Sequence, residues 1–105
     1  MDKIPVKIDR LLKKYLQKLG ENRIPIRHAV LFGSYAAGGS NEWSDIDIAL
    51  VSDAFEGVRI RDRNKIRKIT LDISADLSPL PFRPEDFTPE DPFVREIIEH
   101  GINIV

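Results

Sequence analysis

The sequence predicts a small α/β or α+β layer fold, and three observations favour it. Short apolar runs typical of strands alternate with segments whose apolar residues recur at helical spacing. Of the 105 residues, 42% are hydrophobic and 31% are charged, so the chain can bury a core. No cysteine is present, which excludes a disulfide framework, a thiolate zinc site and a cysteine nucleophile. We expect a single domain over residues 1–105 and, since no apolar run could span a membrane, a cytoplasmic protein.

The first part of the chain is predicted to form a helix, a strand and a second, brief helix. Pro5–Leu19 carries apolar residues at steps of three and four, and a glycine follows the expected helix end. His28–Phe32 is a short apolar run typical of a strand. It leads directly into Gly33 and Ser34, after which we expect the brief helix and a glycine-rich loop over residues 38–41.

The second part is predicted to continue the alternation of strands and helices. Asp45–Val51 reads as a strand with apolar flanks, and Val58–Ile69 as a helix with six basic residues. Leu71–Leu77 alternates apolar and polar residues, which predicts a third strand. Three further elements follow: an extended proline-rich connection over Pro79–Pro89, a closing helix over Pro92–His100 and a last edge strand over Ile102–Val105.

Charge is distributed unevenly along the chain. Residues 1–71 carry 14 Lys/Arg and 9 Asp/Glu, a balance of +5, whereas residues 72–105 carry 2 and 8, a balance of −6. Such a split favours a polyanionic ligand on the first part. The basic helix is interpreted as a solvated face, with contact to RNA or to an acidic partner left open.

Two carboxylates stand two positions apart on a predicted strand. The side chains of Asp45 and Asp47 therefore leave the same face of that strand, about 6–7 Å apart. They repel each other, and a divalent cation beside them would turn that repulsion into a binding site. Oxygen ligands and the absence of cysteine favour Mg²⁺ or Mn²⁺ over zinc. The alternative is a solvated strand edge.

The second feature of the candidate site is the Gly33-Ser34 pair, whose serine lies eleven positions before Asp45. A glycine there allows a ligand to approach the backbone, and the Ser34 hydroxyl with the following helix start offers donors to an anion. Together with the carboxylates, this predicts a site for a metal-chelated triphosphate. No P-loop or dinucleotide-binding motif is present. A third carboxylate is expected from Leu71–Leu77, where the spacing leaves Asp72 and Asp76 open.

The runs 31–38 and 44–51 resemble the signature of minimal nucleotidyltransferases of the DNA polymerase beta superfamily. That signature is Gly-Ser, ten residues, then Asp-x-Asp, and residues 35–44 supply the ten. The resemblance implies a nucleotidyltransferase palm, which is a mixed β-sheet with flanking helices. It also implies transfer of a nucleoside monophosphate from a nucleoside triphosphate, with ATP as the expected substrate. Two divalent ions would assist the transfer, Mg²⁺ or alternatively Mn²⁺.

The resemblance also implies roles for single residues. Asp45 and Asp47 would bind both metal ions, and Gly33 and Ser34 would hold the triphosphate. The third aspartate of the family precedes a short apolar stretch that is often followed by Pro-Leu, which selects Asp76 as a metal ligand and an aid to deprotonation of the attacking hydroxyl.

Finally, the resemblance implies a partner. Stand-alone members commonly pair with a small helical HEPN-type toxin, so the chain is expected to be the antitoxin, which transfers AMP to a hydroxyl of that protein. One departure is Ala37, where the family frequently has arginine. It favours the alternative of an inactive antitoxin that neutralises its partner by binding alone. An antibiotic nucleotidyltransferase is a third hypothesis, and homo- or hetero-oligomers stay open.

Overall fold

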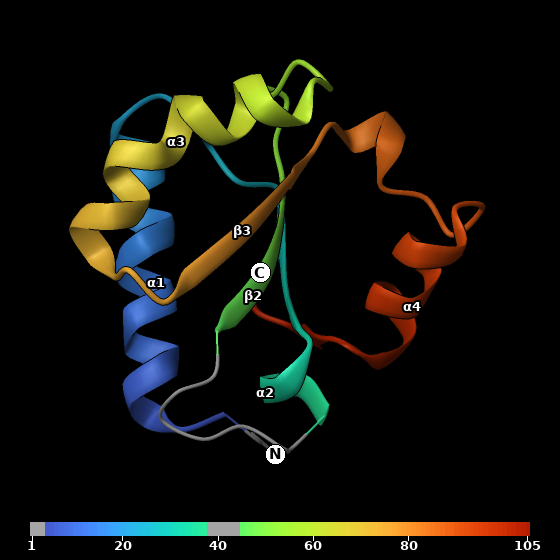
Figure 1. Cartoon of the computed structure of the whole chain (residues 1–105), viewed down its shortest axis with the longest axis horizontal. Helices are drawn as coiled ribbons and strands as arrows, with labels where there is room; N and C mark the ends of the chain where they lie inside the picture. The colour runs from blue at the N-terminus through green and yellow to red at the C-terminus, as the bar shows by residue number, and fades with distance from the viewer. Residues whose placement is uncertain (1–3, 38–44) are drawn as a thin grey trace.

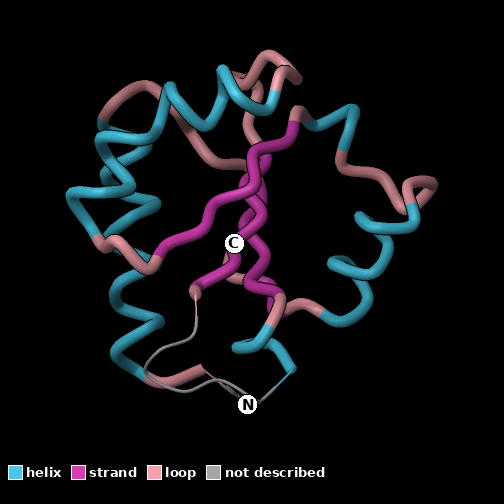
Figure 2. Tube along the Cα trace, viewed as in Figure 1, coloured by secondary structure: helices cyan, strands magenta, loops and turns pink. Residues whose placement is uncertain are grey.

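The architecture is a four-stranded mixed sheet between two groups of helices. A computed structural model describes residues 4–37 and 45–105. Figure 1 shows the sheet nearly edge-on, with α1 and α3 on one side and α4 on the other, and Figure 2 shows the strands between them. The elements are α1 (Val6–Glu21), β1 (His28–Phe32), α2 (Ser34–Ala37), β2 (Ile46–Val51), α3 (Arg59–Ile73), β3 (Leu77–Phe82), the 3₁₀ turn η1 (Pro84–Asp86), α4 (Pro92–His100) and β4 (Ile102–Asn103).

The strand order is β3-β2-β1-β4, so β3 and β4 are the edges. β1 pairs antiparallel with β2 and β4, whereas β2 and β3 run parallel. A parallel pair needs a crossover connection, and α3 supplies it. The register sets Phe32 opposite Asp47 and Asp47 beside Ser78. The end of β1 and the starts of β2 and β3 therefore meet at one end of the sheet.

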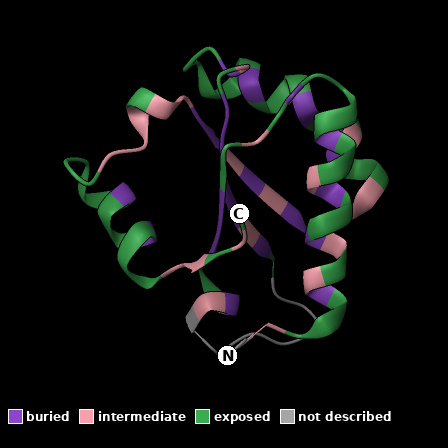
Figure 3. Ribbon diagram, turned by 180° about the vertical axis from the view of Figure 1, so that it is seen from behind, coloured by how far each residue is buried: buried purple, intermediate pink, exposed green. Residues whose placement is uncertain are grey.

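Helices pack on both faces of the sheet with one apolar side each. In α1 the buried residues are Ile8, Leu12, Tyr15 and Leu19, at steps of four, three and four. Figure 3 shows these helices buried toward the sheet and exposed on their outer sides. Alternate residues of β2 serve the two faces, with Ile48 under α1 and α3, and Ala49 in the cluster with α4. Among residues 4–37 and 45–105, no helix combines the length and apolarity that crossing a membrane would need.

A buried polar contact joins α1 to α3. The hydroxyls of Tyr15 and Thr70 are 2.6 Å apart, and the Thr70 hydroxyl donates to the carbonyl of Ile66 at 2.9 Å. Because the single proton of Thr70 serves Ile66, Tyr15 must be the donor to Thr70. Burial raises the pKa of Tyr15 to about 12, against the opposing effect of the Thr70 hydrogen bond. Tyr15 therefore remains a protonated structural donor at neutral pH.

Most predicted elements are confirmed, including the mixed sheet, but the strand predicted over Leu71–Leu77 is wrong. Residues 71–73 form the last turn of α3, and the strand begins at Leu77 instead. The helix continues because Ile66, Ile69 and Ile73 extend an apolar face at steps of three and four. A short alternating segment fits both patterns, and packing against α1 decides between them. The glycine-rich loop predicted over 38–41 lies outside the described residues.

Part of the extended connection predicted over Pro79–Pro89 is a strand, since β3 continues to Phe82 and includes two of the prolines. The carbonyls of Asp76 and Phe82 accept from β2 and its continuation at 2.9 and 3.1 Å. Alternate residues of a parallel strand bond the same neighbour, so Pro79 and Pro81 direct their backbone away from β2. They lie on the open edge of the sheet, where a missing N–H breaks no ladder bond.

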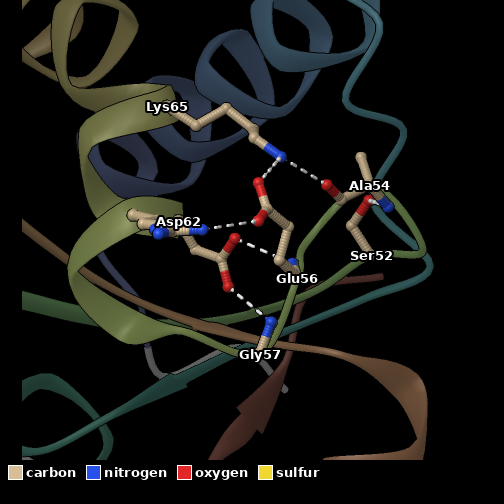
Figure 4. A network of polar contacts seen from close by, with 7 residues as sticks. Ser52, Ala54, Glu56, Gly57, Asp62 and Lys65 are labelled. Carbon is tan, nitrogen blue, oxygen red and sulfur yellow. Dashed lines mark hydrogen bonds and ion pairs between the residues drawn. The ribbon is translucent and has the colours of Figure 1, made fainter.

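A buried aspartate holds the loop between β2 and α3. Asp62 lies in the first turn of α3 and accepts from the backbone N–H groups of Glu56 and Gly57 at 2.8 and 2.9 Å (Figure 4). Lys65 adds a bond to the Ala54 carbonyl at 2.8 Å. The start of α3 is thereby tied to the chain that leaves β2, which fixes the crossover to β3.

Replacing this carboxylate tests that role. Asp62→Ala leaves two N–H groups without their acceptor, and we expect a loss of about 2–4 kcal/mol in the free energy of unfolding. Urea denaturation followed by circular dichroism measures the change. Asp72→Ala, an exposed carboxylate on the same helix, serves as the control and should change the free energy by less than about 0.5 kcal/mol. Equal losses in both variants would contradict the assignment.

Candidate active site

The two sequence-predicted carboxylates lie at the start of β2. Asp45 immediately precedes the strand and Asp47 is its second residue. Because Ile46 and Ile48 pack under α1 and α3, both aspartates project from the opposite face. Asp45 is exposed and Asp47 is half-buried. The predicted juxtaposition of the pair on one face is therefore present.

Asp47 carries charge in an environment that disfavours it. Burial raises the pKa of its carboxyl, and the negative charge of Asp45 raises it further. A hydrogen bond with the Ser78 hydroxyl acts in the opposite direction. Among the residues that the structure describes, no cation contributes to this pKa. A bound cation would supply the stabilisation that the pair lacks.

Gly33 directly follows β1 and lies beside Asp47. Its φ of +74° is a conformation that residues with a Cβ rarely adopt. A Cβ at this position would collide with the Asp47 carboxylate oxygen and lie 3.1 Å from its Cγ. Ser34 then begins α2. The Gly-Ser turn and the carboxylate pair, separated by eleven positions in the sequence, thus lie against each other.

The structure places Asp76, and not Asp72, next to the carboxylate pair. The Asp76 carbonyl accepts from the Ile46 N–H at 2.9 Å, which sets Asp76 beside Asp45 across the two strands. Leu77 is buried under the helices, so Asp76 faces the side of the aspartates. Asp72 lies on the exposed side of α3.

The three aspartates do not close into one ligand cluster. Across 4–37 and 45–105, no group of three His, Cys, Asp or Glu side chains is gathered closely enough to hold a metal ion. The site thus consists of a carboxylate pair, with a third carboxylate immediately before the adjacent strand.

The donors at this site fit a hard divalent cation. Asp45 and Asp47 supply carboxylate oxygens, the Ser78 hydroxyl lies against Asp47, and the chain has no cysteine. Ser78 was missed by sequence reasoning because the third strand was placed too early. The signal that would have found it is its spacing of two from Asp76, the same spacing as in Asp45-x-Asp47 on the neighbouring strand.

A cleft of about 540 Å³ opens beside Gly33, between α2 and α4. Phe32 and Phe93 contribute aromatic rings to it, packed edge to face with centroids 6.2 Å apart. Phe93 is 49% exposed. The cleft therefore offers a flat apolar surface next to the turn that follows β1.

Comparison with known proteins agrees with this geometry. A family described as nucleotidyltransferase domain matches residues 9–104. A Methanocaldococcus jannaschii protein named putative protein adenylyltransferase is 36% identical over an alignment of 86 residues that covers 77% of this chain. The chain spans 56% of that relative's length. The crystal structure of a putative nucleotidyltransferase from Sulfolobus solfataricus shares the fold, with a TM-score of 0.59 and 19% identity over 83% of this chain and 74% of that one.

The close approach of Gly33 to Asp47 gives a prediction on stability. Gly33→Ala forces a Cβ into a left-handed backbone and against the carboxylate, so we expect a loss of about 1–3 kcal/mol in the free energy of unfolding. The control is Gly20→Ala in α1, where a Cβ meets nothing within 4 Å. It should stabilise the protein by about 0.5–1 kcal/mol. A neutral Gly33→Ala in chemical denaturation would contradict the geometry.

The charge on Asp47 gives a second prediction. The pKa of Asp47 is higher in the folded protein than in the unfolded chain. At a pH above the folded-state pKa, the ionised carboxylate therefore lowers the free energy of unfolding, and this loss vanishes at a pH below the unfolded-state pKa. Asp47→Asn should therefore raise the Tm of the protein in EDTA at pH 7, and the difference should shrink as the pH falls toward 4. Asp72→Asn is the exposed control, and an unchanged or lower Tm for Asp47→Asn would refute the interpretation.

Proposed function

The chain belongs to the nucleotidyltransferase family, and we propose that it transfers AMP from ATP to a hydroxyl of a partner protein, as the antitoxin of a HEPN/MNT toxin–antitoxin pair. The observation that carries the proposal is the carboxylate pair Asp45 and Asp47 against the Gly33-Ser34 turn. The name of the Methanocaldococcus jannaschii relative supports a protein acceptor.

Each residue of the site has a role in this proposal. Asp45 and Asp47 would hold divalent metal, Mg²⁺ or Mn²⁺, with Asp76 as a further ligand. When bound, two such ions neutralise charge on the attacking and leaving oxygens of an in-line displacement. Gly33 would allow the triphosphate to approach the backbone of the turn, and Ser34 would add its hydroxyl as a donor.

The proposed reaction balances at the α-phosphorus of ATP. The acceptor oxygen forms a bond to that phosphorus, and the bond to the bridging oxygen of pyrophosphate breaks. Asp76, exposed and on the same face as the pair, would take the proton of the acceptor hydroxyl. The products are an AMP ester of the partner and pyrophosphate.

Label transfer from α-phosphate-labelled ATP tests the proposal. The chain, Mg²⁺ and a lysate of its source organism should yield a labelled protein band. In the Asp45→Asn/Asp47→Asn variant we expect the label to fall at least about 100-fold, since two groups at the reacting centre are lost. Asp72→Asn removes an exposed carboxylate outside the site and should label like the wild type.

Other outcomes would redirect the proposal. Full labelling by the double variant would exclude the carboxylate pair from the reaction. No label from any nucleoside triphosphate, together with neutralisation of a toxin that survives loss of both aspartates, would establish an antitoxin that acts by binding alone. Mass spectrometry of a labelled band identifies the acceptor residue.

A further inference from the structure

A groove of about 610 Å³ runs between α3 and the open edge of the sheet. Arg59, Arg63 and Arg67 line it from the helix, and Leu77 and Pro79 line it from β3. In Figure 1, β3 is the strand nearest the viewer, with α3 above it and to its left. Because β3 is an edge of the sheet, no further strand of the described residues covers this side of the groove.

The arginines of this groove form a stripe of charge. They stand at steps of four on α3, so their side chains lie along one side of the helix. Arg59 stacks over the Phe82 ring, with 5.8 Å between its guanidinium carbon and the ring centroid. Arg63 and Arg67 are exposed, and within the described residues neither forms an ion pair. Their charge is available to an anionic partner.

Two of the three other cations of α3 share one carboxylate. Arg61 and Lys65 pair with Glu56 at 3.8 and 3.3 Å, on the side of the helix that carries the Asp62 network (Figure 4). Four cations of α3 form no ion pair within the described residues. Three of them, Arg59, Arg63 and Arg67, line the groove, and the fourth, Lys68, does not. This asymmetry distinguishes the groove from an evenly solvated helix face.

Apolar residues flank the arginines on the same side of the helix. Ile60 is 70% exposed and Leu71 is 56% exposed, and both line the groove. In the described part of the chain, no aromatic side chain lines the groove, so bases have no ring to stack on there. The arginines can pair with carboxylates, and the apolar residues beside them can contact aliphatic side chains. The groove therefore favours a protein segment that carries both over a nucleic acid.

The prolines of β3 decide how such a segment would bind. The backbone of Pro79 and Pro81 faces the open edge of the sheet, and neither residue has an N–H to donate there. An added strand would lack these bonds, so β-augmentation is disfavoured. The guanidinium groups can instead hold carboxylates through paired N–H donors.

The groove also lies next to the candidate active site. Leu77 and Pro79 face the groove, whereas Ser78 on the same strand faces Asp47, and Asp76 immediately precedes the strand. The groove and the carboxylate pair thus lie on opposite faces of the sheet at its β3 edge, and no strand of the described residues lies beyond β3. We infer that the groove docks an acidic, aliphatic-rich segment of the acceptor protein, which reaches around the edge of β3 to the aspartates. This inference rests on the proposed function for its protein acceptor.

Direct binding tests the groove without the reaction. The probe is a fluorescein-labelled 16-residue peptide of Glu and Leu, followed by fluorescence anisotropy at low salt. Arg63→Glu/Arg67→Glu should weaken its Kd at least about tenfold. The matched control is Arg10→Glu/Lys14→Glu, an equal change of charge at the same spacing on the exposed side of α1, which should stay within about twofold. If the first variant does not fold by circular dichroism, Arg63→Gln/Arg67→Gln replaces it.

Three results would overturn the inference. The first is equal peptide binding by the groove variant and its control. The second is a 12-nucleotide single-stranded RNA that binds more tightly than the peptide and loses its affinity in the groove variant. The third is self-association of the wild type in sedimentation that disappears in the groove variant, which would assign the groove to a second copy.

Label transfer then separates this inference from the proposed function. If the wild type labels a protein, the groove variant should label it at least about tenfold less than the Arg10→Glu/Lys14→Glu control. Unreduced labelling overturns the docking role and leaves the proposed function standing. If peptide binding depends on Arg63 and Arg67 but the wild type labels no protein, the docking role of the groove is supported and the proposed transfer reaction is contradicted.

Discussion

The contact between Gly33 and the Asp47 carboxylate is the constraint on which the rest of the site depends. It exists because β1 and β2 pair in a register that sets Phe32 opposite Asp47, so the turn after β1 passes directly over the carboxylate. Only a residue without a Cβ fits, and only glycine readily adopts the φ of +74°. The Gly33 backbone therefore lies directly against the Asp47 carboxylate, which fills the space that a Cβ would take.

The second constraint is electrostatic. Two aspartates on one face, one of them half-buried, raise the free energy of the ionised folded state. The hydroxyl of Ser78 relieves only part of this cost. The pair therefore lowers stability at the site, and a bound cation would restore it. Stability and cation affinity would then be linked through the same two carboxylates.

β3 connects the site to the surface that we assign to the acceptor. Its residues alternate between the groove under α3 and the face of the carboxylate pair, so one strand serves both. Its prolines protect the edge from strand pairing while leaving the groove open. The loop that Asp62 fixes sets where α3 begins, and hence where its arginines lie relative to β3.

Local pattern was enough to predict the carboxylate pair and the glycine turn of the candidate site. The spacing of two in Asp45-x-Asp47 determines that both side chains share a face of any strand, and the Gly33-Ser34 pair marks the turn whatever the fold around it. The choice between Asp72 and Asp76 was different. The residues alone left it open, and only the resemblance to a family pointed to Asp76.

Tertiary structure decided the remaining features of the site and the groove, because these features depend on contacts between distant segments. Packing against α1 extends α3 to Ile73, which turns Asp72 to the exposed side of a helix and starts the strand at Leu77. The parallel register with β2 then sets Asp76 beside Asp45 and Ser78 beside Asp47. A parallel pairing joins strands through a long crossover, so no local spacing encodes its register. For the same reason, the groove between α3 and β3 could be found only once both elements were in place.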